Sequence, residues 1–395
     1  MKNLIILGGD GYLGWPTAMF FSKKGYNVTV VDNLFRRKIC ASKNVGLLYK
    51  PPTLINRAKI WYKKTGLEIK VIIKDLRNPE NMFSLFDRNC KYNWSINSAY
   101  SGLPHTIIHY AEQPSAPYSM KDIESANFTI LNNVNVTNNL LFAVKKFSKK
   151  THIIKLGTMG EYGTPNIDIE EGWLNVVKKG RKQKFLFPRQ ASSIYHTSKI
   201  MDTDLIWFAV RTWGLRVTDL MQGPVYGLLT DEMQKDERLM SIFNYDEIFG
   251  TVINRFITQA VAGHPLTIYG KGGQTRGYLN IKDTLQCVYY SARYPAKKNE
   301  LRIFNQIVET FSVKELAERI SKVASKIGYS SKIKQIKNPR VELEKHYYNP
   351  KYQGLKKLGV KTTPLTDKII QEMIELVAKY KNNINQEVFF KKIKW

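Results

Sequence analysis

The first third of the chain alternates short apolar runs with longer segments of helical periodicity. The apolar runs are typical of buried strands and lie at residues 4–7, 28–31, 69–73, 106–109 and 153–156. Helical periodicity appears between them, at residues 16–24, 82–89 and 130–147. Strands that alternate with helices form right-handed βαβ units around a parallel sheet. The pattern therefore predicts an α/β fold with a Rossmann-like, doubly wound parallel sheet.

The pattern loosens after Gln222. Short apolar pieces at 266–269 and 301–305 lie among helical segments at 313–326 and 367–380. This arrangement predicts a smaller C-terminal substrate-binding lobe, interleaved with the last elements of the sheet, and a ligand cleft between the two parts. The expected sheet domain comprises residues 1–223, rejoined by roughly 251–262 and 278–308, and the expected lobe comprises 224–250, 263–277 and 309–395.

Charge and cysteine content narrow the class of protein. The chain has 395 residues, of which 43% are hydrophobic, and 61 Lys and Arg against 33 Asp and Glu give a net charge of +28. Because the basic residues are scattered and no nucleic-acid-binding motif accompanies them, we interpret the excess as a solvated surface that favours anionic substrates. No apolar run approaches the ~20 residues of a membrane span, and no signal-peptide core is present. Cys40, Cys90 and Cys287 lack metal-ligand spacing, which predicts a cytoplasmic protein without a metal site.

A glycine-rich turn directly follows the first expected strand. Its residues are Gly8-Gly9-Asp10-Gly11-Tyr12-Leu13-Gly14. Glycines at a strand-to-helix turn let the backbone approach a pyrophosphate, which rests on the helix N-terminus. Asp32 ends the second strand, where a carboxylate accepts both ribose hydroxyls of NAD and repels the 2′-phosphate of NADP. The candidate NAD-binding residues are Gly8, Asp10, Gly11, Tyr12, Leu13, Gly14, Asp32, Asn33, Arg36, Asp75, Leu76, Tyr110, Asn133, Tyr195, Lys199, Gln222 and Val225.

Tyr195 and Lys199 stand four residues apart, on one face of an expected helix. A tyrosine ordinarily titrates near ~10, and the positive charges of a lysine and of a bound nicotinamide favour the phenolate that general base catalysis requires. Thr158 follows the fifth strand and completes the Tyr–Lys–Thr set of short-chain dehydrogenases. His196 either takes part in proton transfer or only orients Tyr195. The candidate catalytic residues are Thr158, Tyr195, Lys199, Glu161 and His196.

Four segments carry a more specific resemblance. They are Leu-Gly-Thr-Met-Gly-Glu-Tyr-Gly-Thr-Pro-Asn at 156–166, Gln-Ala-Ser-Ser at 190–193, Tyr-Gly-Lys-Gly-Gly-Gln-Thr-Arg-Gly-Tyr at 269–278, and Asn-Pro-Arg-Val-Glu at 338–342 with His-Tyr-Tyr-Asn at 346–349. With these segments the chain resembles the UDP-sulfoquinovose synthases, a family of extended short-chain dehydrogenases that modify nucleotide-sugars. The resemblance runs from Met1 nearly to Trp395. Related dehydratases carry Thr-Asp-Glu where this chain has Thr158-Met159-Gly160-Glu161, which argues against a simple 4,6-dehydratase.

The resemblance implies a reaction of UDP-glucose with sulfite on an NAD that is reduced and reoxidised within one turnover. Tyr195 takes the proton of the sugar 4-hydroxyl, the 4-ketone acidifies C5, water leaves across C5–C6, sulfite adds at C6, and C4 is reduced again. Glu161 is the leading candidate for the C5 and C6 steps, with Thr158 and His196 as the others. The resemblance also places the enzyme among the hydrolases. The implied substrate-binding residues are Gln113, Thr158, Gln222, Thr267, Tyr269, Gln274, Arg276, Arg340 and Glu342.

One departure and several alternatives remain. Plant and cyanobacterial members have arginine where this chain has Pro114, so another group, such as Lys121 or His264, takes over any contact that this arginine makes.

The resemblance implies a homodimer formed through helices at 127–146 and 195–213. The alternative enzymes are a UDP-glucose 4-epimerase and a nucleotide-sugar 4,6-dehydratase. The alternative from another class is a non-catalytic NAD sensor or RNA-associated protein, which has no need of a Tyr–Lys–Thr set.

Overall fold

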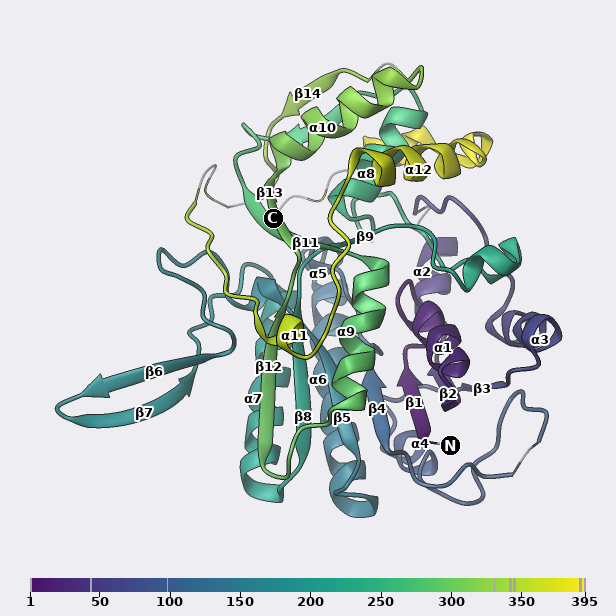
Figure 1. Cartoon of the computed structure of the whole chain (residues 1–395), viewed down its shortest axis with the longest axis vertical. Coiled ribbons are helices and arrows are strands. Elements are labelled where there is room, and N and C mark those ends of the chain that lie inside the picture. Colours follow the sequence, from purple (N-terminus) through teal and green to yellow (C-terminus); the bar gives the residue numbers. More distant parts are fainter. Residues whose placement is uncertain are drawn as a thin grey trace.

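A seven-stranded parallel sheet forms the body of the molecule (Figure 1). The computed structural model describes residues 2–42, 45–97, 99–329, 331–340, 343, 346–390 and 393. The strand order is β12-β8-β5-β4-β1-β2-β3, and every neighbouring pair is parallel. The predicted doubly wound fold is confirmed. The strands are β1 (Asn3–Leu7), β2 (Asn27–Asp32), β3 (Ile69–Ile73), β4 (Thr106–His109), β5 (His152–Thr158), β8 (Arg216–Gln222) and β12 (Glu300–Gln306).

Helices cover both faces of this sheet. On one face α1 (Gly14–Lys23), α3 (Leu54–Thr65) and α9 (Ile281–Arg293) share an apolar core with the strands. On the other face α4 (Pro79–Ser84), α6 (Ile123–Phe147) and α7 (Ile194–Trp213) do the same. Two short helices, α2 (Phe35–Ser42) and α5 (Ala116–Ser119), follow the carboxyl ends of β2 and β4. Burial on both faces explains why the strands read as continuous apolar runs.

All five apolar runs of the first third are strands of the sheet, but one helix was misjudged. The helix expected at 82–89 is wrong, because α4 begins at Pro79 and ends at Ser84. The Asn78 side chain caps this helix by accepting a hydrogen bond from the Glu80 N–H at 2.8 Å, and Pro79 suits the first helical position. Capping chemistry, rather than apolar periodicity, therefore sets the start of this helix.

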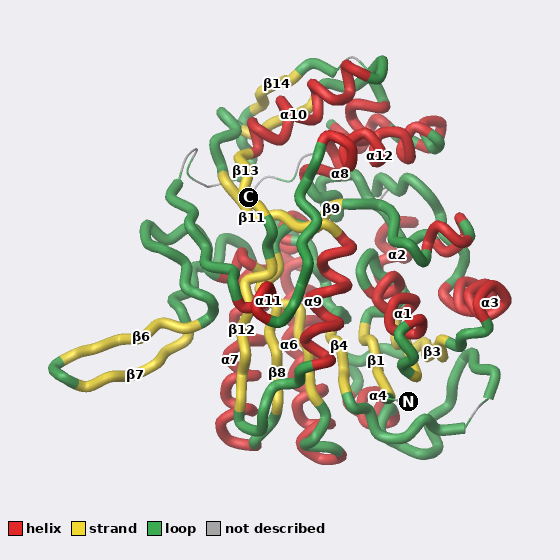
Figure 2. Tube along the Cα trace, in the orientation of Figure 1, coloured by secondary structure: helices red, strands yellow, loops and turns green. Residues whose placement is uncertain are grey.

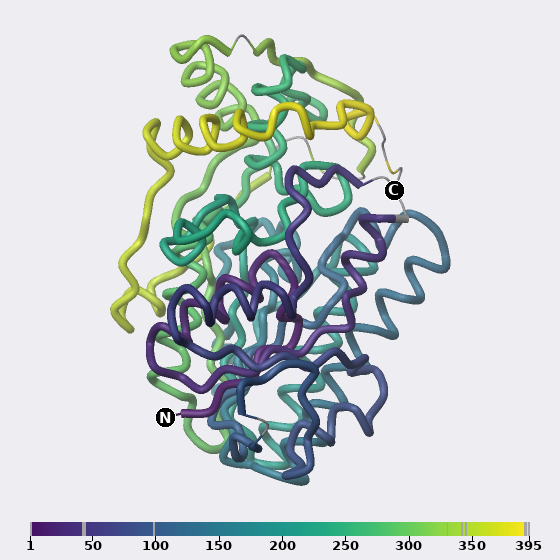
Figure 3. The backbone as a smooth tube through the Cα atoms, turned by 90° about the vertical axis from the view of Figure 1, so that its right-hand side faces the viewer, coloured from purple at the N-terminus to yellow at the C-terminus, as the bar shows by residue number. Residues whose placement is uncertain are grey.

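The C-terminal lobe has its own apolar core. Its helices are α8 (Val252–Val261), α10 (Val313–Lys326) and α12 (Asp367–Ala378), and Figure 3 shows α12 crossing the lobe. Its strands are β9 (Val225–Tyr226), β10 (Leu266–Tyr269), β11 (Thr275–Asn280), β13 (Glu309–Ser312) and β14 (Ile333–Ile336).

Helix α8 differs from the expected division of the chain, which assigned residues 251–262 to the sheet domain. Its apolar side chains, among them Ile253, Phe256 and Ile257, are buried in the core of the lobe together with residues of α10 and α12. The helix is amphipathic, and its apolar face faces the other helices of the lobe. The remaining domain boundaries stay a prediction.

A two-stranded ribbon projects from the body (Figures 1 and 2). It consists of β6 (Trp173–Lys178) and β7 (Arg181–Leu186), which pair antiparallel. The short helix α11 (Gly354–Lys357) lies next to β12. Single 3₁₀ turns occupy Met159–Glu161 (η1), Met233–Lys235, Glu237–Leu239, Lys381–Asn383 and Gln386–Phe389. Within the described residues, none of the helices has both the length and the apolar character that a membrane span requires.

A buried arginine of α3 forms an ion pair with the acidic residue of the glycine-rich turn. Arg57 on α3 has a fully buried side chain and donates to Asp10 Oδ1 at 2.5 Å, while its guanidinium lies 4.7 Å from the centre of the Trp15 ring. Arg37 donates to both oxygens of the same carboxylate, at 2.5 and 2.9 Å, and its side chain is 23% exposed. Burial lowers the pKa of Arg57 to about 10, so this arginine stays charged at neutral pH. Two arginines thus fix the first turn of the fold through one carboxylate.

We predict that Arg57→Met lowers the free energy of unfolding by about 3–5 kcal/mol, because it leaves the buried Asp10 carboxylate with one cation instead of two. Urea denaturation would measure this loss. Arg37→Met is the matched control, since it removes a partly exposed partner of the same carboxylate and should cost about 1 kcal/mol or less. Equal losses in the two variants would contradict a special role for the buried arginine.

Candidate active site

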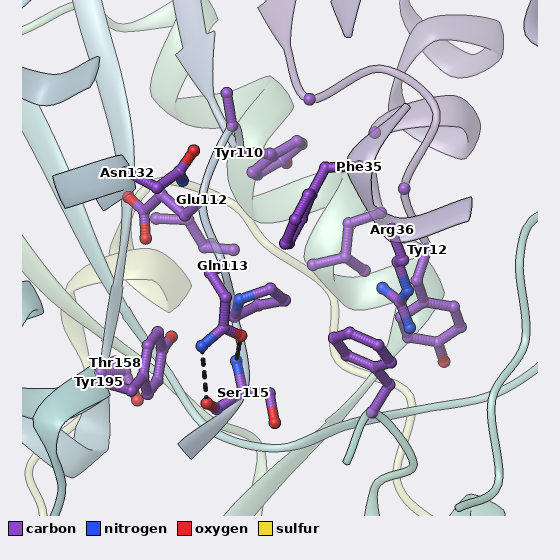
Figure 4. Close-up of a pocket in the computed structure, with 18 of the residues that line it drawn as sticks. Tyr12, Phe35, Arg36, Tyr110, Glu112, Gln113, Ser115, Asn132, Thr158 and Tyr195 are labelled. Carbon is purple, nitrogen blue, oxygen red and sulfur yellow. Dashed lines mark hydrogen bonds between the residues drawn. The ribbon is translucent and has the colours of Figure 1, made fainter. Parts of the chain in front are cut away.

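A cleft of about 380 Å³ opens at the carboxyl ends of the strands, bordered by the lobe. The glycine-rich turn, the ends of β2, β4, β5 and β8 and the start of α7 line it from the sheet side. Residues 247–251 and Arg340 line it from the lobe side. In parallel α/β sheets this edge is where ligands bind. Figure 4 shows side chains that surround the cleft.

Most of the predicted NAD-binding residues line this cleft. Those that do are Gly8, Asp10, Gly11, Tyr12, Leu13, Gly14, Asp32, Asn33, Arg36, Asp75, Leu76, Tyr110, Tyr195, Gln222 and Val225. Asn133 and Lys199 lie behind the cleft wall. The structure therefore brings together residues of β1, β2, β3 and β8 that are far apart in the sequence.

The geometry of the turn fits a dinucleotide. Gly8 adopts a left-handed φ of +85°, and a Cβ atom on Gly14 would lie 2.0 Å from the Gly8 carbonyl oxygen, so neither position accepts a side chain. The Asp32 carboxylate accepts hydrogen bonds from the Asp10 and Leu34 N–H groups at 2.8 and 2.7 Å. Burial raises the pKa of Asp32 to about 6. A close-packed turn at the N-terminus of α1 beside a buried carboxylate suits the pyrophosphate and ribose of NAD.

The prediction for Asn133 is wrong by one residue. The Asn133 side chain is buried, where it accepts from the Gln113 N–H at 2.8 Å and donates to Ser198 Oγ at 3.0 Å. Asn132 faces the cleft instead (Figure 4). Successive residues of a helix point about 100° apart. The sequence pattern of α6 does not show which of these two neighbouring asparagines points into the cleft.

The expected catalytic pair of hydroxyls comes together. Thr158 ends β5, Tyr195 lies in the first turn of α7, and both line the cleft (Figure 4). Ser193 caps α7 by accepting from the His196 N–H at 3.2 Å, and the Tyr195 N–H donates to Ser119 Oγ at 3.0 Å. These bonds fix where the phenol ring enters the cleft.

Lys199 lies one helical turn behind Tyr195 and is fully buried. Its ammonium donates to the Leu156 carbonyl oxygen at 2.6 Å and forms an ion pair with the Glu112 carboxylate. Burial, and after it the negative charge of Glu112, raise the pKa of Tyr195 well above its ordinary value. The lowered tyrosine pKa that we expected from Lys199 is therefore not found in the protein alone. The sequence analysis did not identify Glu112 as a site residue. Its place in the loop after β4, at the edge of the sheet where ligands bind, could have indicated it.

The prediction for Glu161 as a catalytic carboxylate is contradicted by its position. Glu161 is completely buried and does not line the cleft. Its carboxylate accepts from the Thr158 N–H at 3.3 Å and from Thr203 Oγ1 at 3.1 Å, and lies 3.6 Å from Lys155 Nζ and 3.5 Å from Arg189 Nε. Burial raises the pKa of Glu161 above its ordinary value. The physical reason is the 3₁₀ turn η1, in which Glu161 forms a capping box with Thr158 and turns its side chain inward.

His196 lines the cleft beside Tyr195. Its Nδ1 lies 3.0 Å from the hydroxyls of both Ser192 and Ser193, and Gly160 packs so closely that a Cβ there would lie 2.3 Å from Nε2. Burial, followed by the charges of Arg340 and Arg276, lowers the pKa of His196 to about 3. The imidazole is therefore neutral at physiological pH, and its contacts favour a role in orienting the start of α7.

The predicted substrate-binding residues divide into two groups. Gln113, Thr158, Gln222 and Arg340 line the cleft, whereas Thr267, Tyr269, Gln274 and Arg276 do not, and Glu342 lies outside the described residues. The hydroxyl of Thr267 in β10 accepts from Gln259 Nε2 of α8 at 2.8 Å and is a structural contact. The Gln113 amide donates to the Ser115 carbonyl oxygen at 2.9 Å and to Thr129 Oγ1 at 2.8 Å, so it shapes the loop after β4 (Figure 4).

The lobe end of the cleft is positively charged. The Arg340 guanidinium lies 5.8 Å from the centre of the Tyr269 ring, and the Tyr269 hydroxyl donates to Glu247 at 3.0 Å. Arg276 lies 2.9 Å from His346 Nε2. The charges of Arg340 and then Arg276 lower the pKa of His196. Gln274 is buried behind them and donates to the Tyr269 carbonyl oxygen at 3.4 Å.

Neither expected replacement for the family arginine reaches the cleft. Pro114 itself lines it, but Lys121 pairs with Asp122 on the surface. His264 packs 4.9 Å from the Phe389 ring in the lobe. Both replacements are wrong. The basic side chains that line the cleft are Arg36, Lys74 and Arg340. Within the described ranges, no three His, Cys, Asp or Glu side chains gather as metal ligands.

Comparison with known proteins extends these observations. A sequence model described as the NAD dependent epimerase/dehydratase family matches residues 4–305. A chloroplastic UDP-sulfoquinovose synthase of Spinacia oleracea is 44% identical over 394 residues, which covers 100% of this chain and 79% of the relative. A UDP-sulfoquinovose synthase of Sulfolobus acidocaldarius is 38% identical over 401 residues, which covers 100% of this chain and 97% of the relative.

Solved structures share the fold. A UDP-glucose 4-epimerase of Thermotoga maritima with UDP-glucose superimposes with a TM-score of 0.68 at 19% identity, over 96% of this chain and 99% of the other. A UDP-glucose 4-epimerase of Bifidobacterium longum in complex with NAD⁺ and UDP gives a TM-score of 0.69 at 17% identity, over 97% and 100%. At this level of identity the likeness concerns the fold alone.

We predict that Glu161→Gln lowers the free energy of unfolding by about 3 kcal/mol, because it leaves Lys155 and Arg189 with less negative charge in a buried cluster. Denaturation by urea would measure the loss. Asp204→Asn is the control, since Asp204 contacts Arg189 from the surface with its side chain 63% exposed and should cost little. A variant Glu161→Gln with wild-type stability but no catalysis would restore Glu161 as a catalytic group.

Proposed function

Because the chain belongs to the UDP-sulfoquinovose synthase family, within the NAD-dependent epimerases and dehydratases, we propose that it converts UDP-glucose and sulfite into UDP-sulfoquinovose. The family membership rests on two relatives aligned over the whole chain and on the match to residues 4–305. The protein is an NAD-dependent enzyme that acts on a sugar nucleotide. The single observation that supports its chemistry best is that Thr158 and Tyr195 line the same cleft as the glycine-rich turn.

The expected place among the hydrolases is wrong. The matching family consists of epimerases and dehydratases, whose chemistry is the transfer of hydride and the elimination of water. In the proposed reaction a water molecule leaves the sugar, and no bond of the substrate is cleaved by attack of water. The enzyme therefore combines the activities of a lyase and an oxidoreductase.

In the proposed mechanism Tyr195 accepts the proton of the sugar 4-hydroxyl. The glycine-rich turn and Asp32 would hold NAD, which would supply the hydride acceptor for the oxidation at C4 and the hydride donor for its later reduction. Thr158 lies beside Tyr195 and donates a hydrogen bond to the sugar, which holds the reacting hydroxyl against the phenol. The Ser193 cap and the Ser119 contact keep the phenol in this place.

The 4-ketone acidifies the C5–H bond, and removal of that proton expels the 6-hydroxyl as water. With Glu161 turned inward and Met159 buried in the core, the 158–161 segment presents Thr158 alone to the sugar. An acid that could reprotonate C5 is therefore missing from this part of the described wall. The alkene instead takes up bisulfite, whose sulfur forms the C–S bond at C6 while the proton that bisulfite carries goes to C5, before C4 is reduced.

The uridine diphosphate fits the positive end of the cleft. Arg340 lines the cleft there, and Arg276 lies close enough to affect the same imidazole. Guanidinium groups suit diphosphates, because their planar donors match phosphate oxygens in pairs. The excess of basic residues over the whole chain adds a longer-range attraction for UDP-glucose and sulfite.

We predict that the enzyme incubated with UDP-glucose and sulfite yields a UDP-sugar whose 6-hydroxyl has been replaced by a sulfonate, as mass spectrometry would show. Without sulfite, the bound cofactor should accumulate in its reduced form, seen by absorbance. Tyr195→Phe should lower the rate about 10²–10⁴-fold, because proton transfer is lost. UDP-galactose as the main product would replace this proposal with the 4-epimerase, and a 6-deoxy-4-keto sugar would replace it with the dehydratase. A protein that binds NAD without either reaction would be the cofactor sensor.

The proposed homodimer forms through α6 and α7. These helices pack together within the chain and leave large apolar side chains exposed, namely Ile123 (66%), Leu131 (55%), Phe142 (43%), Met201 (41%) and Phe208 (45%). An apolar surface across two neighbouring helices is typical of an interface with a second copy. The cytoplasmic location, expected from the separate cysteines, stays a prediction.

We predict that the double variant Leu131→Glu and Phe208→Glu is a monomer in light-scattering measurements, whereas the wild-type protein is a dimer. Two charges buried against a second copy would cost more than the interface gains. The control is Val177→Glu on the projecting ribbon, whose side chain is 63% exposed and which should leave the dimer intact. A monomeric wild-type protein, or an unaffected double variant, would contradict the proposed interface.

A further inference from the structure

The side chain of Tyr12 extends from the glycine-rich turn to the lobe. Tyr12 lines the cleft (Figure 4), and its hydroxyl donates a hydrogen bond to the Gly227 carbonyl oxygen at 2.5 Å. The same hydroxyl accepts from Asn254 Nδ2 of α8 at 3.4 Å. Since Gly227 directly follows β9, one phenol joins the turn to two elements on the lobe side of the cleft.

The two partners of this phenol also bind each other. The Gly227 N–H donates to Asn254 Oδ1 at 3.3 Å, so three hydrogen bonds form a closed ring between the three residues. The amide of Asn254 is thereby held with its oxygen toward the backbone and its nitrogen toward the phenol. Asn254 is buried, and the helix α8 that carries it packs in the core of the lobe. Tyr12 is therefore attached to the interior of the lobe rather than to a surface loop.

Apolar packing surrounds the same junction. Tyr12 and its neighbour Leu13 pack against a small buried cluster that consists of Val225, Leu279 and Ile281. These three residues lie in β9, in β11 and at the start of α9. Because a phenylalanine at position 12 would keep this packing, removal of the hydroxyl alone separates the hydrogen bonds from the volume of the ring.

Strand β9 extends the connection toward the positive end of the cleft. It pairs in parallel with β11, where Val225 lies opposite Leu279. Strand β11 also contains Arg276, which belongs to the proposed site of the uridine diphosphate. Hydrogen bonds therefore run without interruption from Tyr12 of the turn, through Gly227 and β9, to the strand of Arg276.

Other contacts join the sheet domain to the lobe side at different places. Arg36 of α2 donates to Asn244 Oδ1 at 2.7 Å, and the hydroxyl of Ser115, in the loop after β4, donates to the Ile248 carbonyl oxygen. These contacts begin beside the glycine-rich turn, whereas Tyr12 is part of the turn. A change in the order of the turn therefore acts on the lobe directly through Tyr12.

We propose that Tyr12 is a positioning residue that couples the NAD site to the nucleotide-sugar site, so that each ligand binds more tightly when the other is present. The proposal rests on the proposed function for the uridine diphosphate at the lobe end of the cleft. A pyrophosphate on the turn orders the backbone that carries Tyr12, and the phenol then holds Gly227, β9 and α8 in place. The second ligand meets a lobe that is already ordered, and so loses less conformational entropy on binding.

The experiment measures UDP binding by isothermal titration calorimetry, to protein stripped of nucleotide with charcoal and to the same protein saturated with NAD. UDP contains no sugar, so no turnover occurs. In the wild-type protein we expect UDP to bind at least about fivefold more tightly when NAD is present. In Tyr12→Phe we expect the two dissociation constants to differ by less than about twofold, because the hydroxyl that joins the turn to the lobe is lost.

The matched control is Tyr226→Phe. It removes a second buried tyrosine hydroxyl, which donates to the Thr363 carbonyl oxygen at 3.4 Å within the lobe, and it should keep the wild-type ratio of dissociation constants. If Tyr12→Phe does not fold, Asn254→Ala takes its place, since it removes two of the three hydrogen bonds of the ring and should lower the ratio at least about twofold.

Three results would overturn the proposal: a wild-type ratio below about two, a wild-type ratio in Tyr12→Phe or in the variant that replaces it, and an equal loss in Tyr226→Phe. Protein that binds no UDP in either form would overturn both this proposal and the proposed function. A product other than the sulfonate in the synthase assay would leave the coupling standing, and a lack of coupling would leave the synthase assay unaffected. The two proposals therefore fail separately.

Discussion

The active site depends on one constraint, the requirement that charges removed from water be paired. Lys155 and Lys199 are both fully buried, and the carboxylates of Glu112, Glu161, Asp202 and Asp219 surround them. A buried charge without a partner costs several kcal/mol, so these groups have few alternative arrangements. Because they belong to β5, η1, α7, β8 and the loop after β4, their pairing locks these elements together. The positions of Thr158 and Tyr195 on the cleft wall follow from that lock.

At the other end of the cleft a buried carboxylate is also paired with cations. Asp10 turns its carboxylate away from the glycine-rich loop toward Arg57 and Arg37, which come from α3 and α2. The loop thereby keeps its backbone open for a pyrophosphate, while its one acidic side chain is neutralised from behind. Asp32 remains as a carboxylate on the cleft wall, where the proposed NAD site would have its ribose. Buried ion pairs thus shape both halves of the candidate site.

Apolar and aromatic packing stabilises the lobe and the base of the projecting ribbon. The lobe buries an apolar core between α8, α10 and α12 and contributes Arg340 to the cleft. The β6–β7 ribbon stands off the body and is anchored at its base, where Trp173 packs 4.9 Å from Trp207 of α7. Phe187, next after the ribbon, packs 5.4 Å from Tyr162 beside the 158–161 turn. Aromatic packing thus supports the segment between Thr158 and Tyr195, in addition to the ion pairs that Glu161 forms with Lys155 and Arg189.

The sequence by itself determined the features that depend only on residues close together in the chain. Continuous apolar runs specified the first five strands, the glycine spacing specified the dinucleotide turn, and the four-residue interval placed Tyr195 and Lys199 on one helical face. These features follow from backbone geometry over a few residues, so a linear pattern contains them. The long motifs at 156–166 and 269–278 specified the family for the same reason.

Only the tertiary structure decided which side chains reach the cleft. It turned Glu161 into the interior, put Asn132 rather than Asn133 on the cleft wall, joined Thr267 of β10 to Gln259, and packed α8 into the lobe. It also brought Glu112 to Lys199 across 87 positions of the chain. Such outcomes depend on where distant elements pack and on which buried charges find partners, and that free energy is absent from any short stretch of sequence.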